Sequence, residues 1–192
     1  MDGPEFADTL AAATAGDEAA SAVLWRELNP PLRRYLGLLA PRWADDLASE
    51  TWHDVIRDLH RFSGDERGFR AWLFTIARHR ALDWARREAS RPATPVPVED
   101  LADRRAPDDT AAAALETVST AEALALIARL PADQAEVIAL RVIGGLDVGH
   151  VAEITGRRPG TVRVLAHRGL RRLAAELTDG RPVPQTVRPG GG

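Results

Sequence analysis

The sequence contains neither cysteine nor lysine, so all 25 of its basic residues are arginines. Without cysteine the chain can form no disulfide, no thiolate nucleophile and no cysteine-ligated zinc site. No two of the five histidines have a close metal-ligand spacing, and the sequence predicts neither a metal nor another cofactor. No apolar run approaches the roughly 20 residues that cross a bilayer, and the acidic, alanine-rich N-terminus lacks the basic segment of a secretory signal. These absences favour a cytoplasmic protein without membrane insertion.

The charges are unevenly distributed along the chain, although the formal net charge is only -3. Residues 66–91 contain seven arginines against three acids, and residues 157–172 contain six arginines and no acid. Residues 92–122, between them, contain seven acids against two arginines. Two basic blocks that flank an acidic connector indicate two separate contacts with a polyanion.

The apolar residues recur with helical spacing and show no strand pattern, which predicts an all-α fold of two small helical domains. Residues 30 and 31 are both proline, a pair that suits the start of a helix better than its interior. A flexible acidic linker with four prolines joins the domains, so they are not expected to pack rigidly against each other. The expected segments are an N-terminal extension (1–19), a first domain (20–90), the linker (91–114), a second domain (115–177) and a disordered tail (178–192).

Residues 45–59 of the first domain are predicted to form an amphipathic helix with Leu47, Val55, Ile56 and Leu59 on its apolar side. An acidic strip lies on this helix, and its charges could serve solubility or bind a basic partner surface. A loop at residues 61–68 and an aromatic, arginine-rich helix at residues 69–87 follow. Aromatic rings interleaved with arginines suit unstacked bases on a single strand, although Trp72 is better explained as a core residue.

Residues 130–173 have the pattern of a helix-turn-helix. Two glycines end the first helix, whose apolar face includes Val142. Asp147 is expected to cap the second helix, and Gly156 is expected to end it with a positive φ. The third helix begins at Pro159, with Val162, Leu165 and Leu170 directed inward. Seven residues then face outward, where arginine can bind guanine and phosphate: Arg157, Arg158, Thr161, Arg163, Val164, His167 and Arg168. The alternative is a solvated basic hairpin without a ligand.

Three motifs in this order resemble one known family. The string Asp-Asp-Leu-Ala-Ser-Glu-Thr at residues 45–51 resembles the signature of sigma region 2.2, and residues 69–87 resemble regions 2.3 and 2.4. Residues 130–173 resemble region 4, and no counterpart of regions 1.1 and 3 is recognised. The chain thus resembles a sigma factor of the extracytoplasmic-function (ECF) group of the sigma-70 family. It departs from the usual region 4 pattern at residues 148–152 and at Arg158, where a serine cap is common, so the −35 sequence stays open.

The resemblance implies a sigma factor that binds core RNA polymerase, through the β′ clamp helices and the β subunit, and directs promoter-specific transcription. The implied core-polymerase contacts are Asp45, Asp46, Leu47, Glu50 and Thr51. The implied −10 DNA contacts are Ser63, Arg67, Phe69, Arg70, Arg78, His79, Arg80, Arg86 and Arg87. The outward residues of the last helix become the −35 contacts, and an anti-sigma factor is an expected partner.

Three other functions are alternatives to this one. A stand-alone helix-turn-helix regulator would need a dimer interface or an effector pocket, and residues 1–90 offer neither. A protein that only sequesters a partner would not need the arginines at 157–172. An enzyme is disfavoured because no acid–base or nucleophilic constellation is recognisable, and the resemblance implies no catalytic residue.

Overall fold

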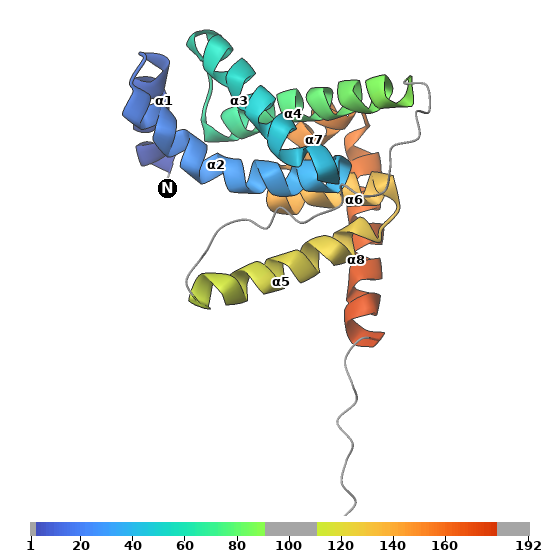
Figure 1. Ribbon diagram of the computed structural model, residues 1–192. Helices are drawn as coiled ribbons and strands as arrows, with labels where there is room; N and C mark the ends of the chain where they lie inside the picture. Colours follow the sequence, from blue (N-terminus) through green and yellow to red (C-terminus); the bar gives the residue numbers. More distant parts are fainter. Residues whose placement is uncertain (1–2, 91–110, 180–192) are drawn as a thin grey trace, which may run out of the picture.

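The computed structural model describes residues 3–90 and 111–179, and every regular element in these ranges is helical (Figure 1). This confirms the prediction of an all-α fold. The predicted linker lies outside the described residues up to position 110, as does the tail beyond position 179. Over the two described ranges, no helix has both the length and the apolar character that crossing a membrane requires.

The first half is a bundle in which α2 packs against α1 and α3, and α3 packs against α4. Asp65 begins α4 by accepting a hydrogen bond from the Gly68 N–H at 2.9 Å, which satisfies one of the free donors of the first turn. The elements are α1 (Gly3–Thr14), α2 (Glu18–Leu39), the 3-10 turn η1 (Pro41–Trp43), α3 (Ala44–Asp58), the 3-10 turn η2 (Leu59–Arg61) and α4 (Glu66–Ala89).

The prediction that Pro30 and Pro31 begin a helix is wrong, because both lie inside α2. A proline in a helix interior costs about 3 kcal/mol, since it removes a hydrogen bond and crowds the preceding turn. Fully buried leucines recur every fourth residue on both sides of the prolines, at positions 24, 28, 32 and 36. Each contributes roughly 1.5–3 kcal/mol on burial, so their combined packing outweighs the cost of the prolines.

The segment predicted as an N-terminal extension contributes to the core of the first half. Phe6 of α1 is fully buried, and Leu10 and Ala13 lie beside it in the same cluster. The ring of Phe6 lies 5.9 Å from that of Phe69, between ring centroids. The core of this half therefore begins at residue 6.

The second half contains the helix-turn-helix. Its elements are α5 (Ala111–Ala128), α6 (Ala132–Ile138), the π-helical turn η4 (Ala139–Ile143), α7 (Val148–Thr155) and α8 (Pro159–Asp179). Asp147 caps α7 as predicted, because its Oδ1 accepts from the His150 N–H at 2.9 Å. Gly156 ends α7 with φ +66°, also as predicted. Only a residue that tolerates left-handed backbone fits there.

Three apolar residues that were predicted to face inward are exposed: Ile56, Val142 and Leu170 are 61%, 64% and 53% exposed. Gly169, rather than Leu170, faces α6 where α8 crosses it, and a Cβ at Gly169 would lie 2.9 Å from Ile138 Cγ1. Val142 lies in the π-helical turn, whose wider winding rotates the side chains away from the regular helical stripe.

The two halves share one hydrophobic core. A single cluster of buried residues runs from α1–α4 into η4, α7 and α8, α4 packs on α7, and α2 packs on η4. Figure 1 shows α6 and α7 lying against the first half, while α8 extends away from it. The sequence predicted that the two domains do not pack rigidly, and in this structure their apolar faces are in contact. Linker composition carries no information on whether the apolar faces of two domains are complementary.

Candidate nucleic-acid and partner interfaces

The turn between α7 and α8 is held by small and branched side chains. Val162 and Leu165 are buried, as the helix-turn-helix spacing predicted, and Ala152 of α7 is buried beside the turn. Their packing fixes the angle at which α8 leaves the turn and leaves the opposite side of α8 in solvent. A recognition helix requires this arrangement, with one face anchored and the other presented.

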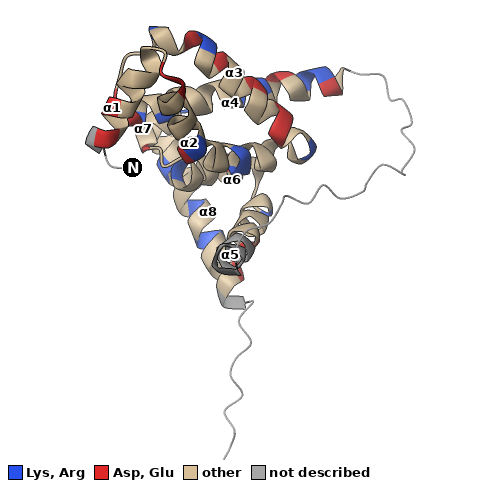
Figure 2. Ribbon diagram, turned by 60° about the vertical axis from the view of Figure 1, so that its left-hand side comes forward, with Lys and Arg blue, Asp and Glu red and all other residues tan. Residues whose placement is uncertain are grey.

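The outward face of α8 carries the predicted −35 residues. Arg158, Thr161, Arg163, Val164, His167 and Arg168 are exposed, whereas Arg157 is partly buried in the turn. In residues 3–90 and 111–179, no carboxylate pairs with Arg158, Arg163 or Arg168. Figure 2 shows arginines spaced along α8. The N-terminus of α8 also presents free N–H groups, so the outward face of α8 suits phosphates as well as base edges.

The acidic strip of α3 divides into exposed and buried residues. Asp45, Asp46 and Glu50 are exposed. Leu47 and Thr51 are only 4% and 0% exposed, and the Thr51 hydroxyl donates to the Leu47 carbonyl at 2.7 Å. The side chains of Leu47 and Thr51 support α3 from the core and are not accessible to a partner in this structure.

Glu50 is linked to the basic helix through Arg80. Arg80 Nη1 donates to Glu50 Oε2 at 3.3 Å, and Arg80 Nε donates to Asp54 Oδ2 at 2.7 Å. Arg57 Nη1 also donates to Asp54, at 2.8 Å. One nearly buried carboxylate, 6% exposed, therefore joins α3 to α4.

Sequence reasoning did not identify Asp54, although its position one turn after Glu50 was a signal for a shared cation. Burial by itself would raise the pKa of Asp54. The hydrogen bonds and charge of Arg80, with those of Arg57, outweigh that effect and hold the pKa below its ordinary value. The carboxylate is therefore ionised at neutral pH.

The predicted −10 residues of α4 and of the preceding loop include exposed residues and arginines that are held in ion pairs. Ser63, Arg67, His79, Arg86 and Arg87 are exposed. Arg70, Arg78 and the exposed Arg86 form ion pairs: Arg70 with Glu66 at 3.0 Å, Arg78 with Glu136 at 2.7 Å, and Arg86 with Asp83 at 2.6 Å.

Phe69 belongs to the core rather than to the DNA-binding face. It is fully buried, and its ring packs edge-on against those of Phe62 and Trp72 at centroid distances of 5.3 and 5.8 Å. Trp72 packs against the core as predicted, stacked on Phe62 at 5.2 Å. Phe69 is therefore a correction to the predicted DNA-binding set.

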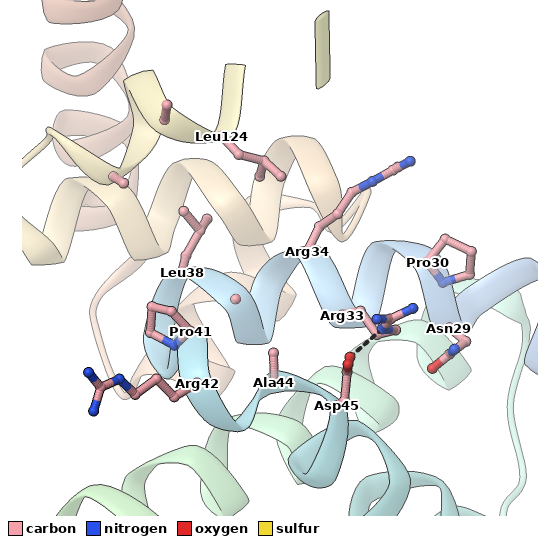
Figure 3. Close-up of a pocket in the computed structure, with 13 residues that line it drawn as sticks. Asn29, Pro30, Arg33, Arg34, Leu38, Pro41, Arg42, Ala44, Asp45 and Leu124 are labelled. Carbon is pink, nitrogen blue, oxygen red and sulfur yellow. Dashed lines mark hydrogen bonds and ion pairs between the residues drawn. The ribbon is translucent and has the colours of Figure 1, made fainter. Parts of the chain in front are cut away.

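A groove of about 640 Å³ lies between α2, the start of α3 and α5 (Figure 3). Its lining is mixed, with the apolar Leu38 and Leu124 beside Arg34 and Arg42. Figure 3 shows Arg33 directed at Asp45, which it meets at 2.6 Å. In the part of the chain that the structure describes, no cluster of histidine and carboxylate side chains could hold a metal ion.

Comparisons with known proteins agree with this division into two halves. The sequence model of sigma-70 region 2 matches residues 24–91, and that of sigma-70 region 4 matches residues 120–173. The chain is 36% identical over 174 residues to the ECF RNA polymerase sigma factor ShbA of Streptomyces griseus subsp. griseus, a match that covers 85% of this chain and 90% of that protein. It is 34% identical over 184 residues to the ECF sigma factor SigD of Mycobacterium tuberculosis, covering 92% and 86%.

The fold also matches a solved structure. The sigma factor RpoE from Bartonella quintana, in complex with the anti-sigma factor NepR, superposes with a TM-score of 0.58 at 23% identity. The match covers 83% of this chain and 98% of that chain. At this identity the likeness establishes the fold.

Proposed function

Because the chain belongs to the ECF group of sigma-70 family sigma factors, which direct promoter-specific transcription, we propose that three of its surfaces divide this task. One binds core RNA polymerase, one opens and holds the −10 element, and one reads the −35 element. The observation that carries the proposal is the face of α8, where exposed arginines stand on a packed helix-turn-helix without an acid in residues 157–172.

The core-polymerase surface is the exposed part of the acidic strip, Asp45, Asp46 and Glu50. These carboxylates lie on the solvent side of α3 and suit a basic partner surface, which the family resemblance identifies as the β′ clamp helices. Leu47 and Thr51 act indirectly in this proposal, because they hold α3 in place from within the core.

The −10 surface comprises the loop before α4 and the basic side of α4. Ser63, Arg67, His79 and Arg87 are exposed and available to single-stranded DNA. Extruding a base costs a few kcal/mol of unstacking, which contacts from these residues must offset. Arg70, Arg78, Arg80 and Arg86 belong to the same surface but are held in ion pairs in this structure.

The −35 surface is the outward face of α8. Arg163 and His167 lie one turn apart in the middle of this face, and Arg157, Arg158 and Arg168 flank them, so the centre faces bases and the flanks face phosphates. The chemistry of initiation would belong to the polymerase, with this chain as a non-catalytic subunit that works in the cytoplasm. An anti-sigma factor, like the one that RpoE of Bartonella quintana binds, is the proposed inhibitor.

In vitro transcription with purified core polymerase on a fragmented genomic library tests this proposal. We expect new, specific start sites when the chain is added, and their loss with Asp46→Arg. Asp8→Arg makes the same charge change at an exposed position of α1 and is expected to retain activity. Absence of core binding and of start sites, with duplex binding intact, would favour the stand-alone regulator instead.

A further inference from the structure

One ion pair connects the two halves of the molecule. Arg78 Nε of α4 donates to Glu136 Oε1 of α6 at 2.7 Å, and the two side chains are only 18% and 12% exposed. Because the pair is largely buried, dissolved salt weakens its attraction less than it weakens that of an exposed pair. The contact joins a residue of the proposed −10 surface to the helix that begins the helix-turn-helix.

Tyr35 of the first half lies near both charges of this pair. Tyr35 of α2 is fully buried and packs edge-on against Phe74 of α4, with ring centroids 5.3 Å apart. Phe74 in turn reaches the second half, because a Cβ placed on Gly144 would lie 3.4 Å from its ring. The ion pair is therefore embedded in the interface that joins the halves.

The interface also carries an unfavourable group. The Tyr35 hydroxyl is buried and has no hydrogen-bond partner among the described protein atoms. Burial and the nearby charge of Glu136 raise the pKa of this hydroxyl, and the charge of Arg78 opposes them. An unpaired buried hydroxyl destabilises the packed arrangement relative to one in which water reaches it. The Tyr35 hydroxyl therefore adds no hydrogen bond between the halves.

The packed arrangement is too small for the proposed function. The −35 and −10 elements are separated by about 25 base pairs, which at about 3.4 Å per step is roughly 85 Å. A compact chain of this length has a radius of gyration of about 16 Å. The two DNA-binding surfaces cannot contact both elements while the halves share one core.

We propose that Arg78 and Glu136 form a latch that holds the free sigma factor in a closed form, and that the latch must open when the protein binds core polymerase. This inference rests on the proposed function. Opening exposes the inner faces of α4 and α6 and frees Arg78 for the −10 strand. The affinity for polymerase is reduced by the fraction of molecules that are closed.

Because the chain contains no cysteine, two introduced cysteines can be labelled specifically, and the latch can be measured in the full chain. Spin labels attached to Ala19→Cys in α2 and Ala175→Cys in α8, both exposed, report the distance between the halves by pulsed electron paramagnetic resonance. We expect one narrow distance distribution for the free protein. Glu136→Gln is expected to add a broad population at longer distances, because Arg78 is then better hydrated in the open form. Arg78→Glu combined with Glu136→Arg should restore the narrow distribution.

Glu66→Gln is the matched control. It removes the same charge from a pair of similar exposure, formed with Arg70 within α4, and should leave the distance unchanged. A narrow distribution in Glu136→Gln, identical to that of the unaltered protein, would overturn the latch whatever the polymerase does.

Binding to core polymerase tests whether the latch must open before the polymerase can bind. Glu136→Gln is expected to bind roughly tenfold more tightly than the unaltered protein, whereas Glu66→Gln binds with unchanged affinity. If Glu136→Gln and the unaltered protein bind with equal affinity although the distance distribution is broader, the proposal that the latch limits polymerase binding is overturned. If neither protein binds core polymerase, the proposed function fails, and the distance measurement still decides whether the latch exists.

Discussion

The guanidinium of Arg80 in α4 donates from both Nε and Nη2 to Oδ2 of Asp54 in α3, and the Nε bond is 2.7 Å long. Asp54 is almost fully buried and accepts a further bond from Arg57. The proposed core-polymerase surface and the proposed −10 surface are therefore fixed relative to each other by one carboxylate.

Asp54→Asn is expected to lower the free energy of unfolding by about 2 kcal/mol at pH 7, because a buried carboxylate is lost from two arginines. The pKa of Asp54 is lowered in the folded protein. Its stabilisation is thus complete above the ordinary aspartate pKa of about 3.9 and is lost as the pH falls through the lowered value. Urea unfolding at pH 7 and pH 3 should show the difference between the two proteins shrinking in acid. Asp46→Asn, on the exposed side of α3, should change stability by less than about 0.5 kcal/mol.

Arg163→Ala tests which contact the centre of the recognition face makes. If Arg163 binds a base edge, the substitution costs about 1–3 kcal/mol on the preferred −35 sequence and relaxes the preference at one base pair. Binding to duplex libraries at several salt concentrations measures this effect. A uniform loss over all sequences, with a salt slope reduced by about 1, would show a phosphate contact instead.

Gly169→Ala is expected to destabilise the second half by about 1–3 kcal/mol, since the new Cβ would lie 2.9 Å from Ile138 Cγ1. Thermal unfolding measures the loss. Gly160→Ala introduces the same methyl group in the same helix, where nothing lies within 4 Å, and should be neutral or slightly stabilising. Ile138→Ala removes the Cγ1 atom, so Gly169→Ala should cost less in an Ile138→Ala background than in the unaltered protein. An equal cost in the two backgrounds would argue against this crossing as the cause.

Phe6→Ala is expected to lower the free energy of unfolding by about 3–5 kcal/mol, as for other fully buried aromatic residues. Guanidinium unfolding measures the change, with Asp8→Ala as the control on the exposed side of α1. A loss below about 1 kcal/mol would show that α1 is a dispensable addition to the first half.

The features that could be predicted from the sequence are those set by neighbours along the chain. The positive φ of Gly156, the cap at Asp147 and the burial of Val162 follow from local patterns that any helix-turn-helix must satisfy. The same holds for the exposed residues 161, 163, 164, 167 and 168 of α8, because the helical period decides which of them share a face.

The features that could not be predicted depend on partners far along the chain. Glu50 and Arg80 are 30 residues apart, and Arg78 and Glu136 are 58 residues apart, so no periodicity relates them. Buried leucines keep α2 helical across Pro30 and Pro31, where the local sequence predicts a helix start. The π-helical turn moves Val142 out of the apolar stripe that the helical period predicts. Phe69 was assigned to DNA because aromatic residues serve both stacking on bases and core packing, and only its surroundings distinguish the two.

The contact of Phe6 with Phe69 also bears on synthesis. The ribosome releases α1 first, but the ring against which Phe6 packs belongs to α4 and emerges only after α2 and α3 have been translated. Until then the apolar side of α1 has no complete surface to cover it, since chains fold in the order in which their domains leave the ribosome. The time needed to translate α2, α3 and the start of α4 therefore sets how long the apolar side of α1 stays incompletely covered.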